Sequence, residues 1–205
     1  MAYRETAQIR TRKQSQRLDI LAAARTRIAT AGYQNAQMQA LAQDCNIATG
    51  TVYRYFPSKA QLFAEVFRQA VQIEVDAVDK AARSAATPSA QLQAIIQTFV
   101  ERALRAPRLA YALLAEPVDP LVEQERLVFR RSYAQVIEQV IRTGIADQSF
   151  VTQHPGLSAA ALVGVLNETL VGPLSPGIDA RIRTHAEPAD LTQSIIALCL
   201  RAVTA

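Results

Sequence analysis

The chain has little of the chemistry on which metal and catalytic sites depend. Its 205 residues include two histidines and two cysteines, whereas zinc sites draw three or four protein ligands from such residues. His185-Ala186-Glu187 imitates the start of a zinc-deaminase signature, but no Pro-Cys-x-x-Cys motif completes it. A glycine-rich phosphate loop and a Gly-x-Ser-x-Gly turn are also lacking. We therefore expect no enzyme, no metal site and no cofactor.

Long hydrophobic runs are lacking as well. No stretch of 18 apolar residues occurs, and the nearest candidate, residues 157–174, is interrupted by Asn167, Glu168, two glycines and a proline. No N-terminal run combines the basic, apolar and small-residue parts of a secretory signal. Cys45 and Cys199 each fall on the apolar side of an expected helix, which favours buried thiols over a disulfide or redox role. These features predict a cytoplasmic protein.

Sustained strand alternation is lacking too, and helical spacing takes its place. Beyond residue 67 alanine, leucine, glutamine, arginine and glutamate dominate, and proline and glycine set the breaks. The spacing of apolar residues predicts helices over residues 58–83, 89–104, 107–115, 121–143, 157–171 and 189–203. Gly144 is expected to end the fourth of these. With the N-terminal helices described next, the chain should be all-α, with about nine helices.

The N-terminal third carries the pattern of two short helices joined by a tight turn. Leu41 and Cys45 lie four residues apart on one helical face, and Val52 and Phe56 lie four apart on another. The two helices can therefore bury these faces against each other. Between them, Asn46 suits the left-handed backbone of a sharp turn. The pattern predicts a helix-turn-helix.

Stop and start signals follow this segment directly. Pro57 ends the second short helix, and Ser58 with Gln61 three residues later forms a capping box that opens the next one. Lys59 then lies in a first helical turn, where unpaired N–H groups already favour an anion. A long helix, residues 58–83, is thus expected to begin beside an anion site and to connect the helix-turn-helix to the rest of the chain.

The outer face of the second short helix is the candidate nucleic-acid surface. With Val52 and Phe56 inward, the residues left outside are Thr49, Gly50, Thr51, Tyr53, Arg54 and Tyr55. A major groove admits one α-helix, whose N-terminal residues reach base edges while hydroxyls and cations nearby hold phosphates. Double-stranded DNA is therefore the first candidate partner.

This region resembles the DNA-binding domain of the TetR/AcrR family of one-component bacterial transcription regulators. The resemblance covers about the first third of the chain. It rests on Ile-Leu-Ala-Ala-Ala at residues 20–24, Gly32-Tyr33, Leu41-Ala42, Thr-Val-Tyr-Arg-Tyr-Phe-Pro-Ser-Lys at residues 51–59, and Leu62-Phe63. The chain departs from the family pattern at Asn46, where glycine is usual, and at Ala48, where a serine-like N-cap is usual.

The resemblance implies roles for individual residues. Near the start of the second helix, phosphates and bases would be met by Gln37 and Gln39. The residues that would face base edges are Thr49, Gly50, Thr51 and Tyr55. The residues that would hold the phosphate backbone are Tyr53 and Lys59. Alanine at the N-cap gives up roughly 1 kcal/mol of capping, so the recognition helix follows an Ala48 cap or, if Thr49 takes over the cap, starts one residue later.

Charge is divided unequally along the chain. Residues 1–59 hold nine lysines and arginines against three acidic residues, whereas the remainder holds thirteen against fifteen. Much of the basic charge precedes the first expected helix, at Arg4, Arg10, Arg12, Lys13 and Arg17. This stretch is either a flexible arm that enters a minor groove or follows phosphates, or a solvated disordered tail. Arg12 and Lys13 are included among the predicted DNA contacts on the first reading.

The last two expected helices favour a homodimer. Both are apolar over more of their surface than one core would bury, and the residues expected at the interface are Ala161, Gly164, Val165, Leu191, Ile195 and Leu198. In a two-fold dimer these helices would form a four-helix bundle with their copies, as the resemblance also implies. The alternative is that they are simply buried within one chain.

The middle helices are where the resemblance implies a small-molecule site. Candidate lining residues are aromatic or isolated polar residues on apolar faces, namely Phe99, Tyr111, Leu114, Phe129, Tyr133, Asn167 and Glu168. Aromatic residues at such spacing are equally compatible with plain core packing, and Asn167 with Glu168 would also suit a dimer seam. The apolar bias favours a hydrophobic or amphipathic ligand over a sugar or nucleotide.

Residues 1–57 are thus expected to form the basic arm and DNA-binding domain, and residues 58–205 a helical ligand-binding and dimerisation domain. The predicted function is a ligand-responsive transcriptional regulator that acts as a repressor on a palindromic operator and is released by a small effector. The alternative is a helix-turn-helix protein without a small-molecule ligand, either architectural or controlled by a protein partner.

Overall fold

The computed structural model describes residues 7–177 and 188–204, and this part of the chain consists of nine helices without a strand. The helices are α1 (Ala7–Asn35), α2 (Met38–Asp44), α3 (Thr49–Tyr55), α4 (Lys59–Arg83), α5 (Pro88–Arg105), α6 (Pro107–Leu114), α7 (Pro120–Ala146), α8 (Pro155–Leu174) and α9 (Pro188–Arg201). The all-α prediction is confirmed. Arg4 and His185, noted above, lie outside the described residues.

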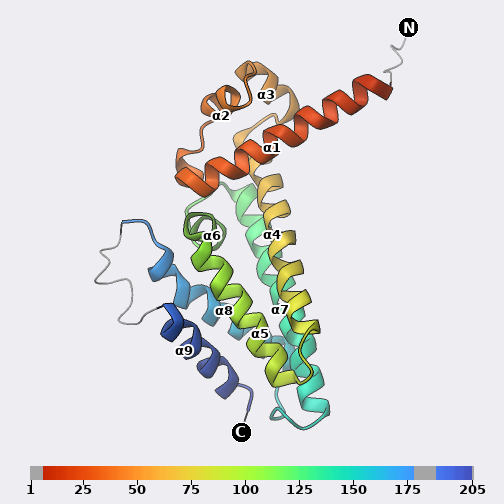
Figure 1. Ribbon diagram of the computed structural model, residues 1–205, viewed down its shortest axis with the longest axis vertical. Coiled ribbons are helices and arrows are strands. Elements are labelled where there is room, and N and C mark those ends of the chain that lie inside the picture. The colour runs from red at the N-terminus through yellow and green to blue at the C-terminus, as the bar shows by residue number, and fades with distance from the viewer. Residues whose placement is uncertain (1–6, 178–187, 205) are drawn as a thin grey trace.

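Helices α1, α2 and α3 lie at one end of the molecule, and a bundle built from the remaining helices extends away from them (Figure 1). The long helices α4 and α7 pack along each other and connect the two ends. The C-terminal end of α9 lies at the end of the bundle farthest from α1 (Figure 1). The helix-turn-helix is therefore carried at the tip of an elongated helical body.

Helix α1 is longer than expected. It begins at Ala7, so Arg10, Arg12, Lys13 and Arg17 lie within the helix, and the expectation of a flexible arm is wrong for these residues. The physical reason is composition, because this stretch has no glycine or proline and is rich in arginine, lysine and glutamine, which favour helix. Its N-terminal turns project beyond the rest of the helix-turn-helix module (Figure 1).

The helix-turn-helix forms where the sequence predicts it. Asn46 has a φ of 51°, in the left-handed region that the turn requires. Val52 and Phe56 are buried together with Leu41. Helix α3 begins at Thr49 after an Ala48 N-cap whose side chain makes no capping bond.

The start of α4 is also confirmed. The side-chain oxygen of Ser58 accepts a hydrogen bond from the Gln61 backbone N–H at 3.1 Å, which closes one side of the expected cap. The helix then runs without interruption to Arg83, so one rigid element joins the helix-turn-helix to the bundle.

Helix α7 passes the glycine that was expected to end it. Gly144 lies within the helix, which continues to Ala146, and the ring of Phe150 folds back onto this position. A Cβ at Gly144 would lie 2.3 Å from Phe150 Cδ2. The glycine therefore permits close packing of the α7–α8 connection, and the left-handed residue comes four positions later, where Gln148 has a φ of 64°.

The buried apolar residues form two clusters, and α6 contributes to both. Leu109, Ala112 and Leu113 join the cluster of the helix-turn-helix module, whereas Ala110 and Leu114 join the cluster of the bundle. The first half of α4, as far as Ala70, also belongs to the N-terminal cluster. The buried residues thus group across the predicted boundary at residue 57.

Of the helices in the described residues, α8 alone is long and apolar enough to cross a membrane by length and composition. Its apolar character has another use in this fold, because one face of α8 packs against α7 and contributes to the bundle cluster.

Candidate functional site

The outer face of α3 presents its side chains largely as expected. Gly50, Tyr53 and Arg54 are exposed, and Thr49 and Thr51 are half-buried. Gln37 and Gln39, at the start of α2, are exposed as well. Tyr53 keeps 45% of its surface in solvent although it is a large aromatic residue. A Cβ at Gly50 would meet nothing within 4 Å, so the space beside this residue is open to a partner.

Tyr55 differs from the other predicted base readers because it is tied to α1. Its hydroxyl donates a hydrogen bond to Gln16 Oε1 at 2.8 Å, and its ring is half-buried. The neighbouring Arg17 lies over the Phe56 ring, 4.9 Å from its centre, and forms an ion pair with Glu65. These contacts hold the basic segment of α1 against α3. A base contact by Tyr55 therefore has to compete with the bond to Gln16.

Lys59 is half-buried and also bonds to its own chain. Its ammonium donates a hydrogen bond to the Tyr33 carbonyl oxygen at 2.9 Å and lies 4.5 Å from the centre of the Tyr33 ring. Burial lowers the pKa of Lys59 below its ordinary value, against the opposing effect of Asp119 and Glu116. The ammonium must give up these partners before it can reach a phosphate, so the expected phosphate contact stays a prediction.

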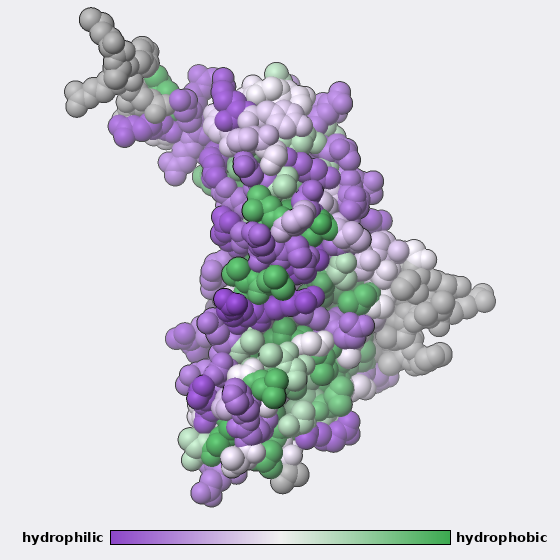
Figure 2. Space-filling view, turned by 180° about the vertical axis from the view of Figure 1, so that it is seen from behind, coloured by the Kyte–Doolittle hydropathy of each residue, from purple (hydrophilic) through white to green (hydrophobic). Residues whose placement is uncertain are grey.

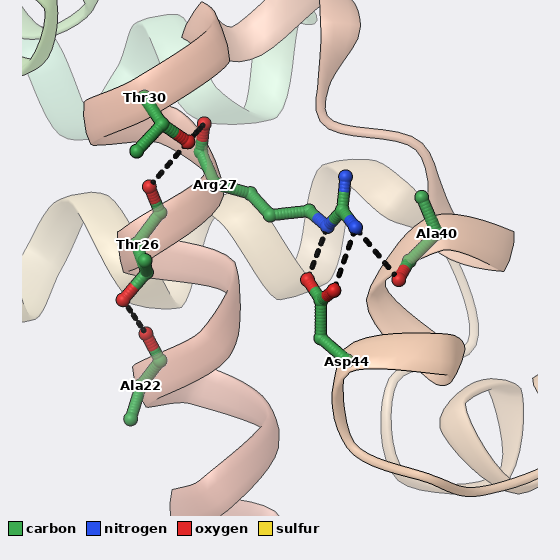
Figure 3. Close-up of polar contacts among 6 residues, drawn as sticks. All are labelled: Ala22, Thr26, Arg27, Thr30, Ala40 and Asp44. Atoms are coloured by element: carbon green, nitrogen blue, oxygen red, sulfur yellow. Dashed lines mark hydrogen bonds and ion pairs between the residues drawn. The ribbon is translucent and has the colours of Figure 1, made fainter.

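Arg27 braces α2 against α1 (Figure 3). Its guanidinium donates to the Asp44 carboxylate, with Nη2 2.7 Å from Oδ1, and to the Ala40 carbonyl at 3.0 Å. The hydrogen bond from Arg27 lowers the pKa of Asp44. Sequence reasoning missed this contact, because a basic and an acidic residue 17 positions apart look like ordinary surface charges. These bonds fix the orientation of α2 relative to α1.

A small cavity lies between α4, α5, α6 and α7. Its volume is about 40 Å³, and its lining residues are Glu74, Phe99, Arg102, Ala103, Ala106, Leu109, Ala110, Leu113, Leu114, Phe129 and Tyr133. Phe99, Leu114, Phe129 and Tyr133 were expected here, and the structure brings all four together. Tyr111 packs against the bundle cluster without lining the cavity.

The cavity has one polar wall that sequence reasoning missed. Arg102 on α5 binds the Glu74 carboxylate on α4 through Nε and Nη2, at 2.5 and 2.9 Å. Tyr133 stands beside this pair, and its pKa is raised, first by burial and then by the Glu74 charge. The spacing of residues 28 positions apart gives no signal for such a pair.

Asn167 and Glu168 lie elsewhere, on a groove between α7 and α8. The groove is also lined by Arg130, Arg131 and Gly164. Asn167 is buried, and its Oδ1 atom has no hydrogen-bond partner among the described residues. These two residues therefore do not share a pocket with the aromatic residues, and their position along α8 agrees with the dimer seam that was the alternative.

The faces expected to form a dimer interface are mostly open in the single chain. Ala161, Gly164 and Leu198 are exposed, and Val165 and Leu191 are half-buried. Ile195 is the exception, because only 2% of its surface is exposed and it belongs to the bundle cluster of its own chain. Its assignment to the interface is therefore wrong. Seen from behind, the lower half of the molecule carries a broad apolar area (Figure 2).

A set of contacts links the bundle to the C-terminal end of α1. Gly32, with a φ of 80° and a ψ of 170°, breaks the helix there. The buried carboxylate of Glu116, which follows α6, accepts hydrogen bonds from the backbone N–H groups of Tyr33 and Gln34, which the break frees from the helix, at 2.8 and 3.1 Å. The Tyr33 hydroxyl donates to Asp119. We call this group of four residues, Tyr33, Gln34, Glu116 and Asp119, the latch.

Arg126 on α7 holds the other side of the latch. Its buried guanidinium donates to the carbonyl oxygens of Ala112, Leu113 and Glu116 at 2.9, 2.9 and 2.7 Å, and it pairs with Glu123. The last turn of α6 and the connection that follows it are thereby fixed to α7. The connection after α6 is thus bonded to both α7 and α1.

Comparisons with known proteins agree with this arrangement. The profile described as bacterial regulatory proteins, tetR family, matches residues 20–66, and the one described as tetracyclin repressor-like, C-terminal domain, matches residues 85–171. The transcriptional repressor KstR of Mycolicibacterium smegmatis is 35% identical over 83 residues, 40% of each chain. The nucleoid occlusion factor SlmA of Actinobacillus pleuropneumoniae is 29% identical over 76 residues, 37% of this chain and 38% of that protein. The chain thus aligns with about two fifths of the length of these curated relatives.

Solved structures show the same fold over nearly the whole chain. The regulator FadR of Bacillus subtilis, solved with stearoyl-CoA, has a TM-score of 0.75 at 18% identity, over 90% of this chain and 98% of that one. RolR, solved with resorcinol, has a TM-score of 0.70 at 21% identity, over 94% and 89%. Both parts of the chain match tetR-family profiles, and the helices follow the fold of such regulators. The chain belongs to the TetR family of bacterial regulatory proteins.

Proposed function

We propose that this chain is a cytoplasmic, ligand-responsive transcriptional regulator that represses from a palindromic DNA operator and is released by a small hydrophobic or amphipathic effector. The observation that carries the proposal is the double role of α6. This helix supplies Leu109, Ala110, Leu113 and Leu114 to the cavity wall, and the connection that follows it is held against α1 by the latch. A ligand and a DNA operator would therefore act on the same short helix.

The DNA side of the proposal rests on charge and exposure. The basic surplus lies in residues 1–59, and α3 presents Gly50, Tyr53 and Arg54 to solvent. Phosphate contacts supply much of the affinity, and residues at the start of a recognition helix read base edges. The exposed Arg12 and Lys13 are carried on a helical turn of α1, so any contact they make with DNA has a fixed direction.

A homodimer would supply a second helix-turn-helix, and we call the helix-turn-helix of each copy a reading head. One helix-turn-helix contacts only a few base pairs, whereas two heads about 34 Å apart read both halves of a palindrome on one face of the duplex. The exposed faces of α8 and α9, with Ala161, Gly164 and Leu198, are the proposed interface. A partner donor at this seam would also satisfy the orphan Oδ1 atom of Asn167.

The cavity is small for an effector, so a bound ligand would have to move one of its walls. Ligand sites usually measure about 300–1,000 Å³, whereas the cavity measures about 40 Å³. A ligand must therefore displace a wall, and α6 is the shortest helix in that wall. Displacement of α6 would pull on Glu116 and thus on Tyr33 and Gln34, which changes the orientation of the reading heads.

The relatives support the broad class of ligand. FadR was solved with stearoyl-CoA and RolR with resorcinol. Both ligands join an apolar part to polar groups. The name of KstR supports repression over activation.

The test is to select binding sequences from a random duplex library and to measure affinity for the selected operator by fluorescence anisotropy. Tyr53→Ala should weaken binding to all sequences about tenfold, because it removes a phosphate contact, whereas Thr51→Ala should change the preferred sequence. Gln97→Ala, on the exposed side of α5, is the control and should change neither. Equal losses in both α3 variants would contradict the division of roles, and the absence of any preferred sequence would contradict the function.

A DNA-binding protein without a small-molecule ligand is the second candidate. The small cavity favours it. Release of the selected operator by a compound found in a thermal-shift screen separates the two functions, since an architectural or partner-controlled protein would keep its operator.

A further inference from the structure

The cavity combines an aromatic body with a single polar end. Tyr133 lies edge to face with Phe99 and with Phe129, at ring-centre distances of 5.0 and 4.6 Å. Leucine and alanine side chains from α5 and α6 complete the apolar wall. The polar groups come from Glu74, Arg102 and Tyr133. A ligand seated here would have a flat or compact apolar body and one polar group at a defined position.

The Tyr133 hydroxyl makes no hydrogen bond within the described residues. Only 2% of the residue is exposed, and Tyr133 is one of the residues that line the cavity. None of the hydrogen bonds within the described residues involves this hydroxyl. Burial raises the pKa of Tyr133, so the hydroxyl stays protonated and can both donate and accept. Polar groups inside a protein normally find partners, and the hydroxyl of this cavity-lining residue is left available to a ligand.

The two charges beside it already cancel. Glu74 and Arg102 are the charged residues among those lining the cavity in the described part of the chain, and they bind each other through two hydrogen bonds. An anionic ligand would therefore add a second negative charge next to Glu74 without a cation of its own. A cationic ligand would meet the converse problem beside Arg102. Burying a charge without a partner is unfavourable, whereas a hydroxyl group is compatible with all three polar side chains.

We infer that the effector is an uncharged, mainly apolar molecule that carries a hydroxyl group, a phenol or an alcohol, and that this hydroxyl binds Tyr133 beside the Glu74–Arg102 pair. The inference rests on the proposed function, which makes the cavity an effector site, and it adds the chemical class of the ligand. Because Glu74 lies on α4 and Arg102 on α5, such a ligand also contacts the ion pair that joins the connecting helix to the bundle.

Three probes of matched shape test the class by calorimetric titration of the full chain. They are para-ethylphenol, para-ethyltoluene and para-ethylbenzoate, which present a neutral hydroxyl, no polar group and an anion. The phenol should bind most tightly, by about fivefold over the toluene for one neutral hydrogen bond. The benzoate should bind most weakly. Tighter binding of the benzoate than of the phenol, or no binding of any probe at millimolar concentration, overturns the inference.

Two variants locate the recognition. Tyr133→Phe keeps the ring and removes the hydroxyl, so it should abolish the advantage of the phenol over the toluene. Tyr111→Phe is the matched control, because Tyr111 is half-buried nearby without lining the cavity, and it should leave the affinities unchanged. Equal affinities for the phenol in wild type and Tyr133→Phe would refute the assignment.

The charge argument has its own variant. Glu74→Gln keeps the shape and leaves Arg102 without a counter-ion, so it should raise the affinity for the benzoate about tenfold or more. Glu138→Gln, which removes a carboxylate from an ion pair on the surface of α7, is the control and should have no effect. No gain for the benzoate in Glu74→Gln would contradict the role of the pair.

These results are independent of DNA binding. If the phenol binds as described and no operator is found, the ligand class holds and the proposed function fails. If an operator is found and only anionic compounds release it, the function holds and the ligand class fails.

Discussion

At the scale of single residues, the protein assigns several polar side chains to its own structure rather than to a partner. Lys59 and Tyr55 were expected on the DNA-facing surface, yet both make internal hydrogen bonds. Only the three-dimensional fold reveals these bonds, because Gln16 is 39 residues from Tyr55 and Tyr33 is 26 residues from Lys59. Val52 and Phe56 were predictable because helical spacing alone determines which face they share.

Lys59 should therefore contribute to fold stability. Lys59→Met is expected to lower the free energy of unfolding by about 1–2 kcal/mol, because it removes a charged hydrogen bond to the Tyr33 carbonyl and a cation–π contact. Urea unfolding measures the change. Lys80→Met, at an exposed lysine in the last turn of the same helix, should differ from wild type by less than about 0.5 kcal/mol. Equal losses in both variants would contradict the internal role.

Cys199 should make stability depend on alkaline pH. Burial raises the pKa of its thiol to about 11 from 9.0. Between these values the folded chain retains a proton that the unfolded chain has released, so stability falls as pH rises, by about 2–3 kcal/mol for this group. Comparison of urea unfolding below pH 9 and near pH 11 should show that Cys199→Ala lacks this part of the loss. An identical pH dependence in wild type and variant would contradict it.

At the scale of elements, helix positions were predictable and the connections between helices were not. Proline, glycine and apolar spacing indicated each helix beyond α3 to within a few residues. The long reach of α1 was missed although its stretch holds no glycine or proline to stop a helix. The passage of α7 through Gly144 was missed because glycine often ends a helix, and only the fold shows that Phe150 packs against this residue. The latch was missed entirely, since Glu116 meets Tyr33 across 83 residues.

Arg126 should stabilise the latch, because it bonds α7 to the end of α6 and to Glu116. Arg126→Lys keeps the charge, but an ammonium on a shorter stem does not match three carbonyl oxygens that a planar guanidinium reaches. The free energy of unfolding should fall by about 2–4 kcal/mol, and amide exchange at Tyr33 and Gln34 should accelerate. Denaturant titration and hydrogen exchange measure the two effects. Arg130→Lys, at an exposed position one turn later, is the control. Equal changes in stability and amide exchange in the two variants would contradict the role of Arg126 in the latch.

At the scale of the whole molecule, the sequence predicted which helices are unusually apolar but not how each divides its surface. Ile195 and Leu198 are three residues apart on α9, and only the fold shows that the first is internal and the second is 44% exposed. The proposed interface was therefore predictable as a pair of helices, while its individual residues required the packing of α9 on α5.

Leu198→Glu should convert the proposed dimer into a monomer. The change places a charge on the apolar face of α9, where a second copy would have to bury it. Size-exclusion chromatography with light scattering at micromolar concentration measures the mass. Ile73→Glu introduces the same charge at a residue of similar exposure, 41%, on α4, and should stay dimeric. A monomeric wild type, or loss of the dimer in both variants, would contradict the assignment of the interface.

The division of α6 between two hydrophobic clusters limits how this regulator can be recombined with others. A chimaera that joins residues 1–83 to a foreign sensor domain loses Leu109, Ala112, Leu113 and Val122, which complete the core beneath the helix-turn-helix. The graft would expose the buried faces of Phe63 and Phe67 and fold poorly. The portable unit of this protein is therefore discontinuous, because the reading head must be transplanted together with α6 and the first turn of α7.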